Sequence, residues 1–144
     1  VIPDQVKLQG TFRTMNEDLR FAMHTRMKEM AVSIAKGMGG DCDFDIHVGY
    51  PFLVNDETLT KQSMAAARAY MGAENVLDLD LRMTAEDFAY YSQKMPGCFY
   101  RLGVRNEAQG LTSGLHTSTF NIDESALTTG MGLMAYLALE ELKH

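Results

Sequence analysis

The sequence predicts an α/β fold in which strands alternate with helices, and two patterns support this prediction. Residues 6–13 and 42–50 each alternate apolar and polar side chains, as half-buried strands do. Between and after these stretches, apolar residues recur every three or four positions, which is typical of helices that pack one face on a core. With 144 residues, 46% of them hydrophobic, the chain has the size of one ordinary domain or two small ones.

The first third of the chain is expected to form a strand–helix–strand unit. Thr14 and Glu17 have the spacing of a capping box, so a helix should follow the first strand. This helix should end at Gly37, because a pair of glycines follows shortly after it. Its apolar stripe consists of Leu19, Met23, Met27, Met30 and Ile34. The helix is therefore expected to cover one face of a sheet whose other face carries charge.

A domain boundary is expected near Asn55, which divides the chain into residues 1–55 and 56–144. Asn55 and Asp56 can both cap a new helix, and this helix should end at Gly72. The part that follows the boundary is expected to be α/β as well, because predicted strands and helices continue to alternate.

The remaining elements follow in that order. Short strands are expected at residues 76–79 and 98–104, and a helix that starts at Thr84 should lie between them and stop at Pro96. A long loop, residues 105–122, then leads to the final helix. That helix is expected to pack on a core through a stripe of Leu127, Met131, Met134 and Ala138.

Composition excludes several classes of partner. A net charge of −6 and a pI near 5.1 argue against nucleic acid or an anionic membrane. No apolar run has the length of a membrane span. Cys42 and Cys98 lie in no metal-binding or redox spacing, so they are expected to be free thiols of a reducing compartment, the cytoplasm. The chain begins without methionine, and we expect it to be part of something longer.

His116 is the first candidate site residue. It lies in a Gly/Ser/Thr loop that leads into the final helix, a position that suits a ligand or a base. A histidine in a loop can equally be an ordinary surface residue, so the position alone does not decide between these readings.

Three charged residues are further candidates. Glu86 and Asp87 open a predicted helix, where acids complement the helix dipole. Together with the nearby Asp78 and Asp80, they could also hold or orient a divalent cation. Arg13 ends the first predicted strand. It is either a solvated side chain at the strand end or a residue whose guanidinium binds a substrate carboxylate through two hydrogen bonds.

Four motifs, taken together and in order, resemble a known family. They are VIPDQVKLQGTFRT, YPFLVND, MTAEDFAYYSQKMPGCFYRLG and GLHTSTFNIDESALTTG, and they extend over essentially all 144 residues. This chain is similar to the C-terminal portion of the aminoacylase and hippurate-hydrolase family. Members of that family are metal-dependent amidohydrolases that cleave N-acyl amino acids.

The resemblance implies an architecture of two parts. Residues 1–55 would match the second half of an α/β (ferredoxin-like) lid domain, which often forms the dimer contact. Residues 56–144 would match the C-terminal part of a Zn-peptidase-like catalytic α/β domain. By the same resemblance His116 is a metal ligand, and Arg13 meets the substrate carboxylate. Glu86 and Asp87 would orient the metal ligands from outside.

The resemblance also implies that this chain is incomplete as an enzyme. A zinc site needs three protein ligands and a water, whereas the matched motifs supply one histidine. The full-length enzyme is expected to use zinc or manganese, to act on N-acyl amino acids and to form a homodimer. This chain alone is expected to bind metal weakly or not at all and to be inactive. Two alternatives stay open: a non-catalytic module that dimerises through an exposed strand edge, and a complete enzyme of another type.

Overall fold

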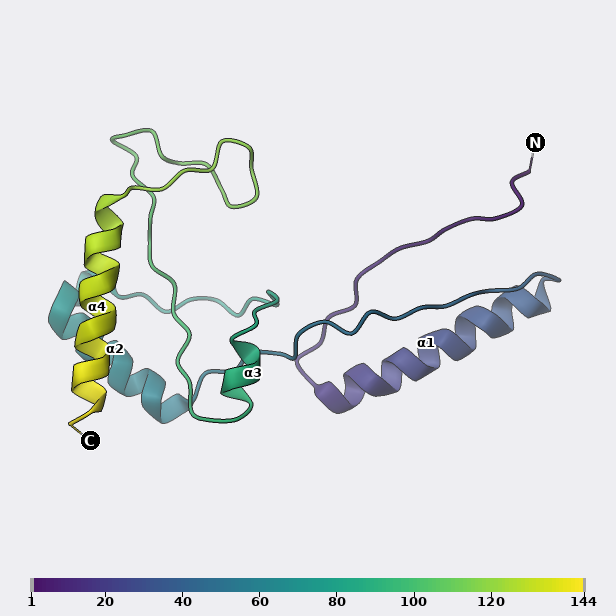
Figure 1. Ribbon diagram of the computed structural model, residues 1–144, viewed down its shortest axis with the longest axis horizontal. Helices are drawn as coiled ribbons and strands as arrows, with labels where there is room; N and C mark the ends of the chain where they lie inside the picture. The colour runs from purple at the N-terminus through teal and green to yellow at the C-terminus, as the bar shows by residue number, and fades with distance from the viewer. Residues whose placement is uncertain (1, 144) are drawn as a thin grey trace. The chain divides into compact units, whose positions relative to one another are not determined.

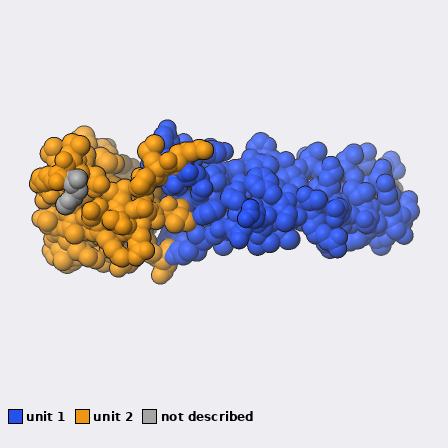
Figure 2. Space-filling view, turned by 90° about the horizontal axis from the view of Figure 1, so that it is seen from below, with its two compact units in different colours: residues 1–53, 81–93 blue, residues 54–80, 94–144 orange. Residues whose placement is uncertain are grey.

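The computed structural model describes residues 2–143; Val1 and His144 lie outside the described residues. The chain divides into two compact units (Figures 1 and 2). The first unit contains residues 1–53 and 81–93, and the second contains residues 54–80 and 94–144. The assignment of residues 1–55 to a lid and 56–144 to a catalytic domain stays a prediction.

Helix α1, Glu17–Gly37, is the main element of the first unit and ends at the predicted glycine. Its N-cap is Asn16, whose side-chain oxygen accepts a hydrogen bond from the amide of Leu19 at 2.9 Å. Thr14, the predicted capping residue, instead accepts a hydrogen bond from the Asn16 amide at 3.2 Å. Local capping chemistry therefore sets the start of this helix, and the observed cap lies two residues after the predicted one.

The predicted α/β class is wrong, because residues 2–143 contain no strand and no sheet. The alternation predicted for residues 42–50 is seen in part as alternating burial: Phe44 and Ile46 are half-buried, whereas Asp43 and Asp45 are exposed. Within the described chain, the only strand-like pairing is an isolated antiparallel bridge between Asn106 and Leu111. Alternation shows which side chains are shielded, but a strand also needs a neighbour for its backbone hydrogen bonds. The predicted strands at residues 6–13, 42–50, 76–79 and 98–104 have no such neighbour in this structure.

Arg20 connects α1 to the segment that runs back beside it (Figure 1). Its guanidinium donates to the carbonyl of Tyr50 at 2.9 Å and to that of Gly49 at 3.3 Å, and it pairs with the carboxylate of Glu17. Glu17 in turn accepts a hydrogen bond from the amide of Phe52 at 3.3 Å. A charged pair on the first turns of α1 therefore holds residues 49–52 in place.

Helix α3, Ala89–Ser92, is shorter than the predicted helix that starts at Thr84. Ala89 is fully buried, and the ring of Tyr90 meets that of Tyr50 edge to face at 5.8 Å between centroids. The residue that follows α3, Gln93, donates its side-chain amide to the carbonyl of Phe52 at 3.1 Å. The segment held by Arg20 is thus also held by α3.

The second unit is built on helix α2, Glu57–Met71, and the short η1, Ala73–Asn75. The predicted cap and stop of α2 are confirmed: Asp56 accepts a hydrogen bond from the amide of Leu59 at 2.8 Å, and Gly72 follows the last turn. Gly72 has a φ of 90°, a conformation that side chains disfavour.

Asn55 joins the start of α2 to a distant segment. Its side-chain amide donates to the carbonyl of Phe99 at 2.9 Å, and its side-chain oxygen accepts the amide of Phe99 at 2.8 Å. The amide of Asp56 adds a hydrogen bond to the carbonyl of Gly97 at 2.8 Å. Asn55 thus gives Phe99 the two backbone partners that a neighbouring strand would otherwise supply.

Replacing Asn55 with alanine is expected to lower the free energy of unfolding by about 2 kcal/mol, because two part-buried hydrogen bonds are lost. The matched control is Asn75→Ala, which removes exposed side-chain bonds such as that to the Met71 carbonyl and should cost under about 1 kcal/mol. Urea denaturation followed by circular dichroism measures both. Equal losses in the two variants would show that Asn55 has no special role.

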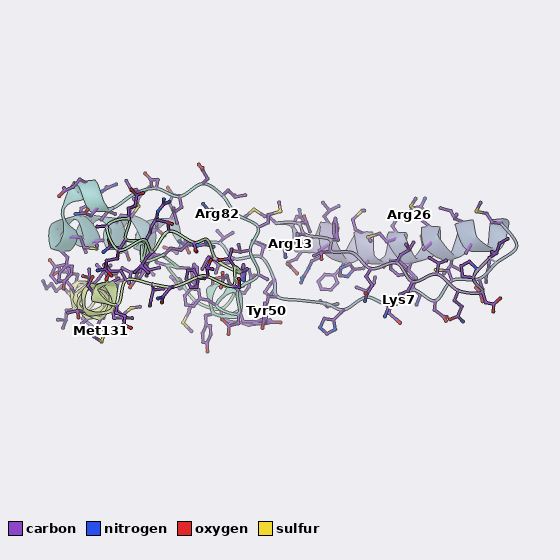
Figure 3. All side chains as sticks on the ribbon, turned by 90° about the horizontal axis from the view of Figure 1, so that it is seen from above. Lys7, Arg13, Arg26, Tyr50, Arg82 and Met131 are labelled. Carbon is purple, nitrogen blue, oxygen red and sulfur yellow. The ribbon has the colours of Figure 1, made fainter. Side chains whose placement is uncertain are left out.

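Helix α4, Ser125–Glu141, packs on α2 through a face that was not predicted. Leu133 is 4% exposed, whereas Met131 (labelled in Figure 3) and Met134 of the predicted stripe are 68% and 58% exposed. The predicted core-facing stripe is therefore wrong. At Gly132, α4 comes close to Tyr70 of α2, and a Cβ atom at this position would overlap the Tyr70 hydroxyl.

Replacing Gly132 with alanine is expected to destabilise the protein by about 1 kcal/mol. Removing glycine from a helix gains about 1 kcal/mol, but the overlap with Tyr70 costs on the order of 2 kcal/mol. The ring of Tyr70 lies 5.3 Å from that of Tyr136, so moving Tyr70 away from position 132 disturbs this ring contact. In a Tyr70→Ala background the same substitution should stabilise the helix, so a double-mutant cycle in urea should show a change of sign. A gain in both backgrounds would contradict the close packing described here.

Candidate functional site

His116 lies at the exposed tip of the loop that precedes α4. Its φ is 64°, and among residues 2–143 no other residue except glycine has a positive φ. This left-handed conformation costs on the order of 1 kcal/mol for a residue with a side chain, although histidine adopts it more readily than most. The rest of the loop must therefore compensate for the conformation of His116.

Side-chain hydrogen bonds cross the loop on both sides of His116. The hydroxyls of Ser113 and Thr119 are 2.8 Å apart, and the hydroxyl of Thr117 donates to the carbonyl of Gly114 at 2.8 Å. The serine and threonine residues of this loop thus act as cross-links between its two halves.

Asn106 and Asp123 close the base of the same loop. The side-chain amide of Asn106 donates to a carboxylate oxygen of Asp123 at 2.7 Å, and Ser125 donates its amide and its hydroxyl to the other oxygen at 3.0 and 2.7 Å. The hydrogen bond from Asn106, followed by those from Ser125, lowers the pKa of Asp123 below its ordinary value of 3.8. The charged form of Asp123 is therefore the one that fits this site.

This lowered pKa predicts how the loop responds to acid. A carboxyl group whose pKa is depressed by folding contributes stability above its ordinary value of 3.8 and loses it as the pH falls through the lower, folded value. We expect the side-chain amide resonances of Asn106 to stay constant down to about pH 4 and then to shift towards those of a disordered loop. A shift centred near neutral pH would contradict this assignment to Asp123.

The other predicted site residues belong to the first unit, whereas His116 belongs to the second. The guanidinium of Arg13 is exposed and donates to the carbonyl of Met83 at 3.1 Å (Figure 3). Glu86 is half-buried, Asp87 is exposed, and their carbonyls accept the amides that begin the turn of α3. The structure thus brings Arg13 to the segment that ends in Glu86 and Asp87. The roles of all four residues stay predictions.

A metal centre is not assembled by the part of the chain that the structure describes. Within residues 2–143, no three histidine, cysteine or acidic side chains come together as a metal ion requires. The residues present, with His116 as one exposed imidazole, therefore do not fit a complete zinc or manganese site.

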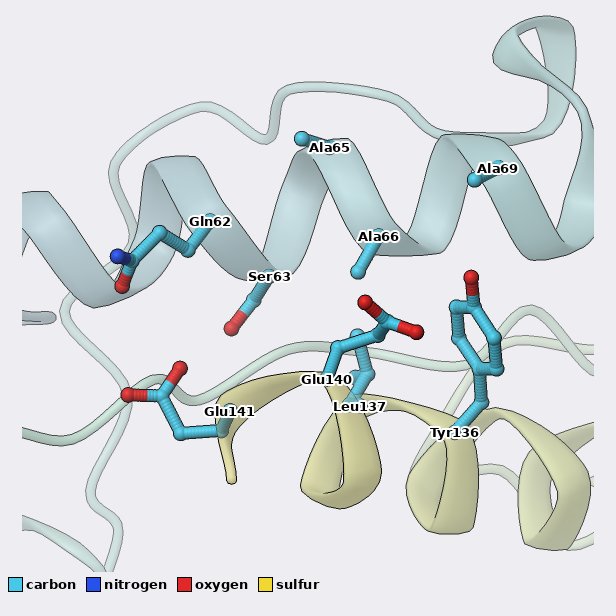
Figure 4. A pocket seen from close by; sticks show the side chains of 9 residues that line it. All are labelled: Gln62, Ser63, Ala65, Ala66, Ala69, Tyr136, Leu137, Glu140 and Glu141. Carbon is cyan, nitrogen blue, oxygen red and sulfur yellow. The ribbon is translucent and has the colours of Figure 1, made fainter. Parts of the chain in front are cut away.

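A groove of about 310 Å³ lies between α2 and α4 (Figure 4). Ala66 and Leu137 contribute to its apolar wall, Glu141 lies towards one end, and Glu140 lies between Glu141 and Tyr136. None of the predicted site residues lines this groove. No helix in the described part of the chain has the length and apolar character needed to cross a membrane.

Comparisons with known proteins match nearly the whole chain. The sequence model of peptidase family M20/M25/M40 matches residues 5–140. N-acetylcysteine deacetylase of Bacillus subtilis is 36% identical over 140 residues, which are 96% of this chain and 35% of that protein. Thermostable carboxypeptidase 2 of Saccharolobus solfataricus is 32% identical over 141 residues, or 97% of this chain and 35% of that protein.

A third relative is the putative amidohydrolase YhaA of Bacillus subtilis, which is 30% identical over 139 residues, or 96% of this chain and 35% of that protein. This chain thus spans about a third of the length of these curated relatives. No solved structure matches it.

Proposed function

We propose, since this chain belongs to peptidase family M20/M25/M40, that it is part of a metal-dependent hydrolase that cleaves the amide bond of N-acyl amino acids. The family match over residues 5–140 is the observation that carries this proposal. The names of the relatives support it, since they include a deacetylase of N-acetylcysteine, an amidohydrolase and a carboxypeptidase. All three names describe the hydrolysis of a bond to an acyl carbon. The resemblance inferred from the four sequence motifs is confirmed at the level of the family.

His116 is the residue that we propose as a metal ligand. It is exposed at a loop tip, and the loop holds it in one backbone conformation. Family members are generally metal-dependent, and a bound zinc or manganese ion supplies an activated water for such hydrolysis. We propose that the remaining metal ligands lie in a part of the enzyme that corresponds to the two thirds of each relative that this chain does not match. Alone, this chain would then bind metal weakly or not at all.

Arg13 is the residue that we propose for the substrate carboxylate. Its hydrogen bond to the Met83 carbonyl uses one of the five N–H donors of the guanidinium, and the side chain is exposed. A planar fork of donors suits a carboxylate. Glu86 and Asp87, close to Met83 in the sequence, are proposed to orient other groups of the site.

A hydrolysis assay tests the proposal. Residues 1–144 would be joined to the part of the Bacillus subtilis N-acetylcysteine deacetylase that they do not match. We expect this protein to release free amino acid from N-acetyl or N-benzoyl substrates, and a chelator should abolish the release. His116→Ala should reduce the rate at least about 100-fold, whereas His47→Ala, at an exposed histidine of the first unit, should leave it unchanged. Full activity of the His116→Ala variant would refute the proposed role.

The isolated chain provides the complementary test. We expect no hydrolysis of N-acyl amino acids by residues 1–144 alone, with or without added zinc or manganese, because the ligand set is incomplete. Turnover by the isolated chain that a chelator removes would contradict this expectation.

A dimeric, non-catalytic module is the second candidate. The observation that favours it is the exposure of Val6 and Leu8, which are 75% and 91% exposed in an unpaired segment. We propose that a homodimer would cover such a segment, both in this reading and in the enzyme. Light scattering distinguishes a homodimer from a monomer. A monomer with well-dispersed NMR spectra would show that the chain folds without pairing the segment that contains Val6 and Leu8.

A further inference from the structure

The His116 loop is held at its two ends by a pair of residues, Asn106 and Asp123, whose contact no sequence motif predicted. Asn106 is the anchor at the first end. Its backbone amide donates to the carbonyl of Leu111 at 3.1 Å, and its carbonyl accepts the amide of Leu111 at 2.8 Å. Its side-chain oxygen also accepts the amide of Gln109 at 3.2 Å, so that only the side-chain amide is left to face the other end of the loop.

Asp123 is the anchor at the second end. Its backbone amide donates to the carbonyl of Val104 at 2.9 Å, which ties the start of α4 to the segment that precedes the loop. One of its carboxylate oxygens accepts Ser125, and the other accepts Asn106 at 2.7 Å. The bond between Asn106 and Asp123 therefore connects two points that are each fixed by backbone hydrogen bonds.

We infer that Asn106 and Asp123 are positioning residues for His116: their hydrogen bond closes the loop and holds His116 in its left-handed conformation. The role of that conformation in holding a metal rests on the proposed function, whereas the closure of the loop does not. The hydroxyl contact between Ser113 and Thr119 crosses the loop nearer its tip, but it joins two neutral groups. A hydrogen bond to a carboxylate is stronger, so the Asn106–Asp123 bond dominates.

A reciprocal swap tests this inference. Asn106→Asp places a carboxylate opposite Asp123, so the donor is lost and two like charges face each other. In the double variant Asn106→Asp, Asp123→Asn, an amide at 123 donates to a carboxylate at 106. The swapped side chains still offer acceptors to Gln109 and Ser125. The double variant therefore restores the bond between positions 106 and 123 with donor and acceptor reversed, and it keeps the bonds from Gln109 and Ser125.

The readout is NMR of the purified 144-residue chain. In Asn106→Asp, the exchange of the Leu111 and Phe120 amides should rise about tenfold, and the backbone shifts of His116 should move towards disordered values. The Leu137 amide, inside α4, should change less than about twofold. The double variant should restore the exchange rates of Leu111 and Phe120 and the backbone shifts of His116. Asn106→Ala, which lacks the added charge, should show the same pattern as Asn106→Asp at smaller amplitude.

The inference is overturned if His116 keeps its shifts in Asn106→Asp, if the swap fails to restore them, or if Leu137 exchanges as fast as Leu111 in both single variants. That last result would show that the bond between Asn106 and Asp123 stabilises α4 as much as it stabilises the loop. The hydrolysis assay on the joined protein tests the proposed function separately. If His116→Ala leaves that rate unchanged while the swap restores the loop, the positioning role stands and the metal role of His116 does not.

Discussion

Replacing Arg20 with methionine is expected to lower the free energy of unfolding of the first unit by about 3 kcal/mol. The side chain of Arg20 is 11% exposed and that of Glu17 is 27% exposed, so this ion pair is largely shielded from water. Methionine fills much of the same volume but leaves the carbonyls of Gly49 and Tyr50 without this donor and the carboxylate of Glu17 without its cation. A largely shielded carboxylate that loses its cation costs more than the lost bond itself, and the loss at Glu17 therefore accounts for most of the effect.

Two controls accompany the Arg20 variant. Arg20→Lys keeps the charge but cannot donate to two carbonyls and a carboxylate with one planar fork, so it should recover only part of the loss. Arg26→Met removes a pair with Glu29 whose side chains are 66% and 58% exposed, and it should cost under about 1 kcal/mol. Amide exchange in α1 reports on the first unit. Equal exchange rates in Arg20→Met and Arg26→Met would show that the Arg20 cluster does not stabilise this unit.

The helices could be predicted from the sequence where their limits depend on neighbouring residues. The stop of α1 at Gly37, and the cap and stop of α2 at Asp56 and Gly72, follow from side chains within a few positions of the helix end. The Arg20 cluster has a local part as well, because Glu17 and Arg20 are three residues apart on a helix. Its other partners, near residue 50, gave no local signal.

The sheet could not be predicted from the alternation alone. Residues 42–46 do shield alternate side chains, but pairing depends on another segment at the right distance and register. At Phe99, the side chain of Asn55 takes the place of such a segment. A single asparagine that replaces a strand neighbour leaves no periodic trace in the sequence.

The candidate site was predictable in its residue types but not in its geometry. The Gly/Ser/Thr character of the loop singled out His116, and the structure adds its positive φ and the cross-links around it. The bond between Asn106 and Asp123 joins residues 17 positions apart, a separation at which no capping or helical rule applies. Sequence spacing therefore found the tip of the loop and missed its base.

The face on which α4 packs leads to the last prediction. Helix α4 is apolar on more than one side, so its sequence offers two candidate faces and periodicity cannot choose between them. In the structure Leu133 is 4% exposed and Leu127, of the predicted stripe, is 52% exposed. Leu133→Ala is expected to lower the free energy of unfolding by about 3 kcal/mol, because it removes buried methyl groups and leaves a cavity.

Leu127→Ala is the matched control, with the same chemical change on the same helix. Because half of Leu127 is already in water, its truncation should cost under about 1 kcal/mol. Leu133→Met, which nearly conserves volume, should cost less than about 1.5 kcal/mol and thereby separates lost volume from altered helix propensity. Urea denaturation of the 144-residue chain measures all three. If Leu127→Ala were as costly as Leu133→Ala, the stripe predicted from periodicity would contribute as much to the core as the face that the structure shows packed on α2.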